Sequence, residues 1–316
     1  MQKWTIQAPS NIALIKYMGK QAHNMPDNPS LSYTLPKLRS IVSLEPISGD
    51  EDILDVWQGD GFQHPLHFSA LAARRFLDHL QRIKEIYDYS GAFLVRSNNN
   101  FPMAAGLASS ASSFAALTQV AVLALSTLTQ SPLLEIAQQA QISREGSGSS
   151  CRSFYAPWVL WQGDIVEPLL SFDLPCLHRV IVVHAGEKAH SSSEAHQRVR
   201  SSPLYEGRAA RAQQRCSALI NAFERGDWAQ AYSIVWEEFQ DMHHLFSTAV
   251  PSFSYMQKET TLALQHLQEG WERSGDGPLV TMDAGPNIHL LYRLDQEAQW
   301  EQLPKQAWVQ TLGQVL

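Results

Sequence analysis

The stretch NNNFPMAAGLASSASSFAAL at residues 98–117 joins two compositions that demand opposite surroundings. Its first half, with three Asn, a Pro and a Gly, favours a tight exposed loop. Its second half is rich in Ala, Phe and Leu and predicts a long buried helix over about 108–128. A helix start carries unpaired N–H groups and a partial charge of roughly +0.5, so a Gly-containing loop there is typical of an anion site.

The same stretch also fits an ordinary loop whose Ser residues bond to the helix start. Gly106 would let the backbone approach a ligand, and Ser109 and Ser110 would add hydroxyl groups. The run has neither the Lys-Ser/Thr ending of a Walker P-loop nor G-x-G-x-x-G spacing. Taken alone, it leaves phosphate binding and a purely structural loop open.

Length and composition indicate a globular protein of two domains. The 316 residues exceed a typical single core, and 44% hydrophobic with 17% charged residues is ordinary for a soluble chain. The longest apolar run, around 120–125, is far short of the ~20 residues that cross a bilayer, and the first residues show no signal-peptide pattern. Three widely spaced Cys argue against a disulfide framework. We therefore expect a cytoplasmic protein without a membrane role.

The charge of the chain limits its partners. A net charge of −7 argues against nucleic acid, whose phosphate backbone selects basic faces, but it leaves room for a small anionic ligand. The 12 His residues show no metal-ligand spacing, so we expect solvated or capping roles for them.

Hydrophobic periodicity predicts strands first and helices later in the chain. The predicted strands are 4–8, 40–46, 92–97, 159–162 and 180–184, and the predicted helices are 71–86, 108–128, 209–225, 228–246 and 254–268. Ser131-Pro132 predicts the start of a helix that runs to 140, followed by a surface loop over 143–154. Residues 278–292 read as a strand, a sharp turn and a strand. The shift in composition near 180–190 predicts two α+β domains, 1–185 and 186–316.

Three more stretches could carry chemistry. GSGSSCRS at 146–153 can form an anion-binding concavity, and Arg152 is suited to a carboxylate or phosphate, although a flexible loop would look the same. Asp283 in DAGPN could be catalytic or could simply bond its own turn. APSNIALIKYMGK at 8–20 places Lys16 and Lys20 in an apolar run, where solvated lysines are the ordinary reading.

Taken in their order along the chain, the four stretches resemble the motifs of the diphosphomevalonate decarboxylases. These belong to the GHMP superfamily of small-molecule kinases, named for galactokinase, homoserine kinase, mevalonate kinase and phosphomevalonate kinase. MHHLFSTAVPSFSYM at 242–256 is similar to a further family segment, so the resemblance spans nearly the whole chain. It implies a two-domain α+β fold, with an N-terminal half like the second domain of ribosomal protein S5 and a ferredoxin-like C-terminal half. It also implies an active site in the cleft between them and a homodimer.

The resemblance implies an ATP- and Mg²⁺-dependent reaction of the mevalonate pathway of isoprenoid biosynthesis. The tertiary hydroxyl of mevalonate 5-diphosphate is phosphorylated, and loss of phosphate and CO₂ gives isopentenyl diphosphate. Asp283 matches the base, and Arg152 would hold the substrate carboxylate. The implied nucleotide-phosphate residues are Gly106, Leu107, Ala108, Ser109 and Ser110, with Ser110 also at Mg²⁺. The implied substrate residues are Tyr17, Lys20, Ser147, Ser149, Arg152, Lys188 and Ser192.

Some positions depart from the family pattern. Met18 replaces the usual Trp, Ser193 replaces an Arg of some members, Ala195-His196 replaces Gly-Met, and Thr248-Ala249 replaces Asp-Ser. Because these changes cluster around the 5-diphosphate end, 5-phosphomevalonate decarboxylation and 3-phosphorylation of mevalonate without decarboxylation stay open. A non-catalytic module that binds isoprenoid intermediates would be expected to lack the Asp, the Arg or the Ser pair, and all are present.

Overall fold

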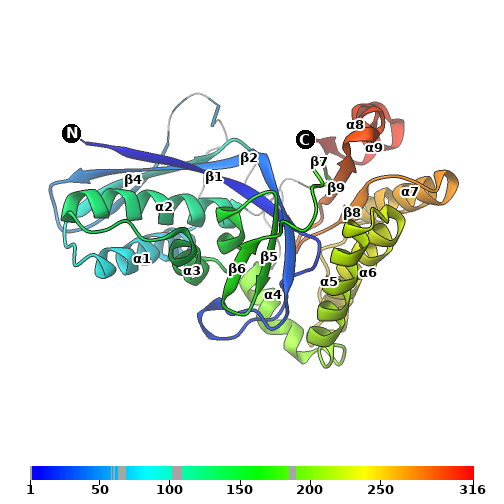
Figure 1. Cartoon of the computed structure of the whole chain (residues 1–316), viewed down its shortest axis with the longest axis horizontal. Helices are drawn as coiled ribbons and strands as arrows, with labels where there is room; N and C mark the ends of the chain where they lie inside the picture. Colours follow the sequence, from blue (N-terminus) through cyan, green and yellow to red (C-terminus); the bar gives the residue numbers. More distant parts are fainter. Residues whose placement is uncertain (1, 58, 60, 63–68, 102–108, 185–189) are drawn as a thin grey trace.

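The fold contains two β-sheets, each with its own helices (Figure 1). The computed structural model describes residues 2–57, 59, 61–62, 69–101, 109–184 and 190–316. A six-stranded sheet has the order β3-β4-β2-β5-β6, with β1 also paired to β2. A four-stranded sheet has the order β10-β7-β9-β8. The predicted α+β class is confirmed.

All strands of the first sheet precede those of the second in the chain. The first sheet contains β1 (Trp4–Ala13), β2 (Ser30–Ile47), β3 (Ile53–Val56), β4 (Ala92–Asn99), β5 (Trp158–Gln162) and β6 (Ile165–Pro168). The second contains β7 (Cys176–Val182), β8 (Leu279–Thr281), β9 (Ile288–Arg293) and β10 (Gln314–Val315). The domain division at 185/186 stays a prediction, and β7, which precedes it, already pairs with the second sheet.

The helices divide in the same way. The first group is α1 (Ala70–Ile86), α2 (Ser109–Thr129) and α3 (Ile136–Gly146). The second group is α4 (Ser192–Arg198), α5 (Arg208–Glu224), α6 (Trp228–Thr248), α7 (Lys258–Ser274), α8 (Glu297–Gln302) and α9 (Ala307–Leu312). In Figure 1, α1, α2 and α3 lie together against the first sheet, while α5, α6 and α7 gather beside the second.

Helix α2 is the core helix that the apolar sequence predicts. Its length and mean hydropathy of 1.6 would allow it to cross a membrane, but 72% of its most apolar window is buried inside the protein. Small residues such as Ala115, Ala116 and Ala121 are fully buried, so the helix packs closely against α1 and the first sheet. Burial in the protein core explains its apolar composition.

The predicted helix start at Ser131-Pro132 is wrong. Helix α3 begins at Ile136, with Glu135 as its N-cap, and the backbone N–H of Glu135 donates to Gln138 Oε1 at 3.0 Å. The Gln139 side chain also donates to Leu134 O at 2.8 Å, which holds the preceding segment in an extended form. This reciprocal capping box starts the helix later than the Ser-Pro pair indicates.

The predicted surface loop at 143–154 is also wrong. Helix α3 continues to Gly146, and Gly148–Phe154 forms a short 3₁₀ helix that is largely buried. The hydroxyls of Ser143 and Ser150 bond to each other at 2.6 Å, so the polar side chains are satisfied inside the protein. A Cβ at Gly146 would lie 2.3 Å from the Phe114 ring, so this glycine permits a close approach.

The Asn run is likewise not the exposed loop that its composition suggests. Strand β4 continues to Asn99, and Asn98 and Asn99 are buried. Asn98 donates to Phe62 O at 2.7 Å, and Asn99 Oδ1 accepts from Ser40 at 2.6 Å. Asn100 bonds to the neighbouring strand β2, where it accepts from Arg39 N–H and donates to Lys37 O. These amide groups therefore fix the end of β4 and Asn100 against β2.

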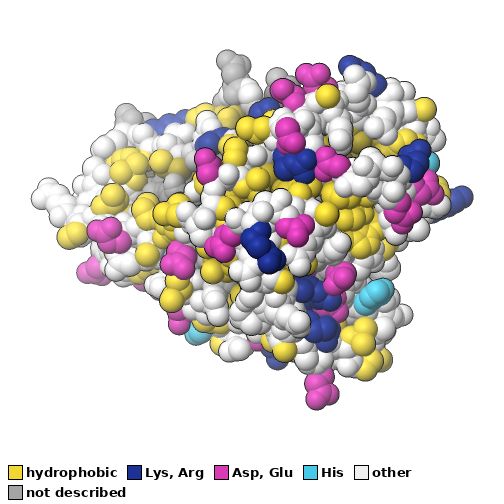
Figure 2. All heavy atoms as spheres, turned by 45° about the vertical axis from the view of Figure 1, so that its right-hand side comes forward, with side chains coloured by type: hydrophobic (Ala, Val, Ile, Leu, Met, Phe, Trp, Pro, Cys, Tyr) yellow, Lys and Arg dark blue, Asp and Glu magenta, His cyan; other side chains and the backbone are white. Residues whose placement is uncertain are grey.

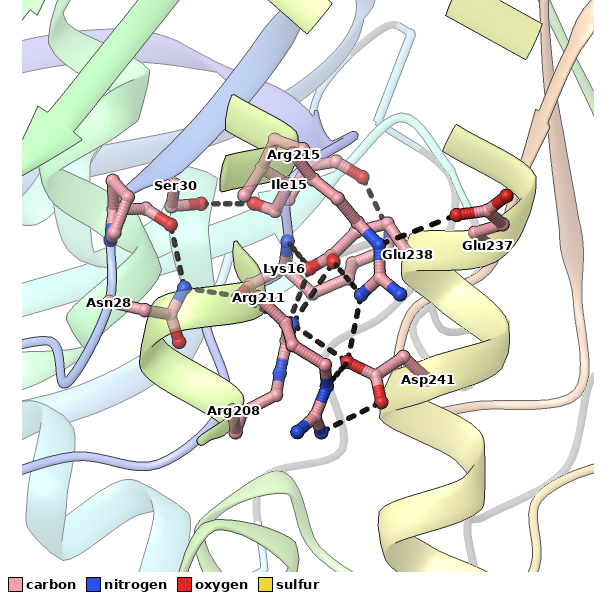
Figure 3. Close-up of polar contacts among 12 residues, drawn as sticks. Ile15, Lys16, Asn28, Ser30, Arg208, Arg211, Arg215, Glu237, Glu238 and Asp241 are labelled. Atoms are coloured by element: carbon pink, nitrogen blue, oxygen red, sulfur yellow. Dashed lines mark hydrogen bonds and ion pairs between the residues drawn. The ribbon is translucent and has the colours of Figure 1, made fainter. Parts of the chain in front are cut away.

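A buried ionic network joins the first sheet to the second group of helices (Figure 3). Glu238 on α6 accepts the backbone N–H of Lys16 at 2.9 Å, just beyond the end of β1. Arg208 on α5 pairs with Glu238 and donates to Lys16 O at 3.3 Å. Figure 3 shows Glu238 and Asp241 facing arginines of α5, and Arg211 and Arg215 bond Asp241 at 2.9 and 2.8 Å.

We expect Glu238→Ala to destabilise the fold strongly. The change leaves Arg208, which is 2% exposed, without one of its carboxylates, and it also leaves the Lys16 N–H unpaired. Breaking a buried pair of this kind costs about 3–5 kcal/mol of unfolding free energy. The measurement is urea unfolding followed by circular dichroism. The matched control is Glu237→Ala, whose 65% exposed carboxylate should contribute about 0–1 kcal/mol. Equal losses in the two variants would contradict the prediction.

Candidate active site

One cavity of about 340 Å³ contains most of the predicted site residues. Its walls come from the segment after β1, α1, the start of α2, the 3₁₀ helix, α4, α6 and the turn after β8. The predicted residues that line it are Tyr17, Lys20, Ser109, Ser110, Ser147, Ser149, Arg152, Ser192 and Asp283. The remaining predicted residues, Gly106, Leu107, Ala108 and Lys188, lie outside the described residues.

Asp283 is held at the cavity by Lys16. It occupies the predicted turn between β8 and β9, where Gly285 N–H donates to its carbonyl at 2.8 Å. Lys16 Nζ donates to Asp283 Oδ1 at 2.7 Å and to Ala13 O at 2.6 Å. His243 Nε2 lies 3.2 Å from Asp283 O. Lys16 is fully buried, whereas the Asp283 side chain is 25% exposed, so the carboxylate remains accessible from the cavity.

The surroundings of Asp283 keep its carboxyl ionised. Burial alone raises the pKa of Asp283, but the charge of Lys16, helped by its hydrogen bond and by Arg152, outweighs burial. The net pKa of Asp283 therefore lies below its usual value. Burial lowers the pKa of Lys16, and the Asp283 charge opposes that effect. The pair is thus placed to present a carboxylate that can accept a proton.

Arg152 is buried and oriented by neutral partners. Its Nε donates to Asn11 Oδ1 at 3.0 Å, and its Nη1 donates to Ser30 Oγ at 2.7 Å. Asn11 is itself fixed, because its amide donates to Ser153 Oγ at 2.8 Å. Within the described part of the chain, Arg152 has no carboxylate at ion-pair distance. Its guanidinium therefore keeps a positive charge for an anionic group in the cavity.

Serine hydroxyls lie where α2 begins and the 3₁₀ helix passes it. Ser109 and Ser110 are the first residues of α2, and both line the cavity. Ser147 Oγ donates to Ser110 Oγ at 3.4 Å, so the two segments meet there. A Cβ at Gly148 would lie 2.6 Å from the Tyr17 ring, so a glycine permits this approach as well.

Lys20 and Tyr17 form another side of the cavity. Lys20 Nζ donates to Asn24 Oδ1 at 2.9 Å, and Tyr17 OH donates to Asn24 O at 2.9 Å. The Tyr17 ring lies 4.6 Å from the Trp161 ring and 4.5 Å from the His196 ring. Burial, with a contribution from the nearby Arg75 charge, lowers the pKa of Lys20.

Sequence reasoning missed three residues of this cavity. Lys16 was read as solvated although its apolar neighbours Ile12, Leu14 and Ile15 are a signal of burial. Arg75 projects from α1 and His196 from α4, and no local motif marks either residue. Among the described residues, the cavity thus contains four basic side chains, Lys16, Lys20, Arg75 and Arg152, against one acidic side chain, Asp283.

The expectation that the histidines are solvated or capping is wrong for several of them. His79, His196, His243 and His289 are all buried. Desolvation lowers the pKa of His79, His196 and His243 to about 3, so these imidazoles are neutral. Among the described residues, no cluster of three or more His, Cys, Asp or Glu side chains could hold a metal ion.

Charged side chains of both signs lie on the surface of the protein. Figure 2 shows Lys and Arg side chains interspersed with Asp and Glu on the face that it presents, without a separate basic patch among the side chains drawn in colour. The excess of positive charge lies inside the cavity instead. That location is suited to a small polyanion.

Comparisons with known proteins cover both halves of the chain. The family described as diphosphomevalonate decarboxylase-like N-terminal domain matches residues 8–166. The family described as mevalonate 5-diphosphate decarboxylase C-terminal domain matches residues 179–312. Diphosphomevalonate decarboxylase of Aspergillus fumigatus is 34% identical, over 93% of this chain and 78% of the relative.

Solved structures agree with the sequence comparisons. A crystal structure of a mevalonate diphosphate decarboxylase from Legionella pneumophila is 50% identical and has a TM-score of 0.92, with 100% of both chains covered. The mevalonate diphosphate decarboxylase from Enterococcus faecalis is 26% identical with a TM-score of 0.81, covering 95% of this chain and 91% of that one. This chain therefore belongs to the diphosphomevalonate decarboxylase family.

Proposed function

We propose that this chain is the decarboxylase that converts mevalonate 5-diphosphate and ATP into isopentenyl diphosphate, ADP, phosphate and CO₂. The observation that carries the proposal is one cavity in which an ionised carboxylate, Asp283, and a buried arginine without a carboxylate partner, Arg152, meet the Ser-lined start of α2. The Enterococcus faecalis relative is described as binding ATP by a mechanism mediated by mevalonate diphosphate. Another relative, 26% identical, forms a complex with MVAPP, AMPPCP and magnesium.

Asp283 acts as the general base. A tertiary hydroxyl is a weak nucleophile, so its proton must pass to a base as its oxygen attacks the γ-phosphorus of ATP. Asp283 accepts this proton, the bond from phosphorus to the bridging oxygen breaks, and ADP leaves. Lys16 holds the carboxylate at 2.7 Å and favours its ionised form.

Arg152 holds the substrate carboxylate during the second step. The phosphate leaves C3 with the electrons of the C–O bond, and the electrons of the bond to the carboxyl carbon form the new C=C bond as CO₂ departs. The Nε and Nη1 atoms of Arg152 are occupied by Asn11 and Ser30. In the part of the chain that the structure describes, Nη2 has no such partner and is available to the carboxylate.

Ser109 and Ser110 contact the nucleotide phosphates at the positive end of α2. Mg²⁺ is usually held by few protein groups together with substrate phosphates, and the Ser110 hydroxyl, which lines the cavity, fits that requirement. When bound, the ion neutralises charge on the transferring phosphates. Three further hydroxyl groups line the cavity and would contact the substrate. They belong to Ser147 and Ser149, beside and on the 3₁₀ helix, and to Ser192 on α4.

The test of the function is product release with three substrates. Purified protein receives ATP, Mg²⁺ and either mevalonate, its 5-phosphate or its 5-diphosphate, and ADP and CO₂ are measured separately. We expect both products in equal amounts, with the highest kcat/KM for the 5-diphosphate. Preference for the 5-phosphate, or ADP without CO₂ from mevalonate, would replace the proposal by one of the related activities. Binding without turnover of any substrate would indicate a non-catalytic module. The homodimer and the cytoplasmic location remain predictions.

Replacing the base should abolish most turnover while the protein stays folded. Asp283→Asn keeps the size of the side chain and a hydrogen bond to Lys16 but cannot accept the proton. General-base contributions are typically about 10²–10⁴-fold, so kcat should fall by at least about 10². ADP release measures turnover, and calorimetry checks ATP binding. Asp295→Asn, at a 69% exposed position, is the control, and a loss below about tenfold in Asp283→Asn would exclude the base role.

Removing the lysine should change the pH dependence of the reaction. In Lys16→Met the largest favourable charge beside Asp283 is lost, so the pKa of Asp283 rises. A base is active above its pKa, so the acid limb of the kcat/KM profile should move to higher pH. The control is Lys84→Met, which removes the other buried Lys–Asp pair, with Asp52 at 3.1 Å. An acid limb at the parental pH in Lys16→Met would contradict this role for Lys16.

The geometry of Arg152 should matter beyond its charge. Arg152→Lys keeps the positive charge but loses the planar fork that reaches Asn11, Ser30 and the substrate together. We expect kcat for CO₂ release to fall by at least about tenfold, the effect of losing one charged hydrogen bond. Arg293→Lys, which changes an arginine that pairs with Asp276 and Asp295, is the control. Parental CO₂ release by Arg152→Lys would rule out the planar contact.

A further inference from the structure

His196 places a neutral hydrogen-bond donor on the wall of the cavity. The side chain projects from α4 and lines the cavity, although only 7% of the residue is exposed. The backbone N–H of Gly19 donates to His196 Nδ1 at 3.1 Å. Because Nδ1 accepts this bond, it carries no proton, and the proton of the neutral ring resides on Nε2. Burial, with the neighbouring charge of Lys20, lowers the pKa of His196 to about 3, which keeps the ring neutral.

With Nδ1 bonded to Gly19, Nε2–H is the group of this cavity-lining ring that can donate to a ligand. Among the described residues, Nε2 has no hydrogen-bond partner. The atom is not sealed inside the protein, so a ligand in the cavity can reach it. The ring is held in place by the Tyr17 ring at 4.5 Å, and Tyr17 is held in turn by the Trp161 ring at 4.6 Å. The donor is therefore fixed in direction before any ligand arrives, which limits the entropy lost on binding.

The charges around His196 indicate what the donor meets. The charged side chains that act on the imidazole are Lys20 first and Arg152 second, and both are positive. Arg75 adds a third cation on the Lys20 side, where its charge lowers the pKa of Lys20. Asp283, the acidic side chain of the cavity among the described residues, is paired with Lys16. A donor beside unpaired cations is suited to a phosphate oxygen.

We propose that His196 donates from Nε2 to the 5-phosphate end of the substrate and helps this enzyme to select phosphorylated mevalonate. The inference rests on the proposed function and adds a specificity residue to it. It also accounts for two departures from the family pattern: a neutral donor occupies position 196 in place of Met, and Ser193 lacks the cation found in some members. The donor offsets part of the binding that an arginine would provide.

The test compares substrates that differ only at the 5-position. KM and kcat are measured for mevalonate 5-diphosphate, mevalonate 5-phosphate and mevalonate with the parent, His196→Met and His196→Gln. Met removes the donor and retains the bulk, whereas Gln retains an N–H donor at a similar reach. His266→Met, an exposed residue of α7, controls for the type of substitution.

We expect His196→Met to raise KM for the 5-diphosphate about tenfold, because one hydrogen bond to a charged group is lost. The increase should be smaller for the 5-phosphate and absent for mevalonate, with kcat nearly unchanged, as for an interaction made equally in the ground and transition states. His196→Gln should recover most of the affinity, and His266→Met should match the parent.

Other outcomes would overturn the inference. An equal rise in KM for all three substrates would place His196 at the carboxylate end or in a packing role. A fall in kcat at unchanged KM would also exclude it. Calorimetric titration of the 5-diphosphate into each variant, after thermal unfolding has shown that the variant is folded, keeps the test independent of turnover. If the parent itself releases no product from any substrate, the proposed function fails, whereas a working parent with identical variants defeats only the inference.

Discussion

The contact between Lys16 and Asp283 is the interaction on which the site depends. These residues lie at opposite ends of the chain, and neither is placed by its own sequence neighbours alone. Lys16 is fixed twice, through its amine to Ala13 O and through its backbone to Glu238. The position of Lys16 beside Asp283 therefore depends on the packing of α6 against the segment after β1. The packing of the two halves therefore creates the surroundings that lower the pKa of Asp283.

The charged side chains described at the cavity are mainly positive, which is suited to a polyanionic ligand. Three cations, Lys20, Arg75 and Arg152, face the cavity without a carboxylate partner in the described portion of the chain. Arg152 is buried, and a buried cation without a carboxylate partner is costly, so a bound anion would complete the arrangement there. The supporting groups around them, such as Asn11 and Asn24, are neutral acceptors that orient the cations without cancelling their charge.

The local sequence predicted the positions of helices and strands better than it predicted which polar side chains are buried. The helix at α2 and the strand-turn-strand at 278–292 follow from hydrophobic periodicity, whereas the roles of Asp283 and Arg152 come from the family resemblance and stay predictions. The Ser-rich segment at 143–154 reads as a loop because its hydroxyls find partners only in three dimensions, as Ser143 does with Ser150. Lys16 and the buried histidines were misread for the same reason. Their partners lie far away in the sequence, and no window of neighbouring residues contains that information.

Gly146 and Gly148 help to define the shape of the cavity because neither residue has a Cβ atom. At Gly146 and Gly148, a single added carbon would enter the rings of Phe114 and Tyr17. The Phe114 ring belongs to α2 and the Tyr17 ring to the segment after β1. An alanine at Gly146 would therefore push the end of α3 away from α2, and an alanine at Gly148 would push the 3₁₀ helix away from Tyr17. Arg152 lies on that helix and Ser147 caps its start, so both would move with it. Efforts to broaden the substrate range of this enzyme should therefore vary side chains on α1 and α4 and keep glycine at positions 146 and 148.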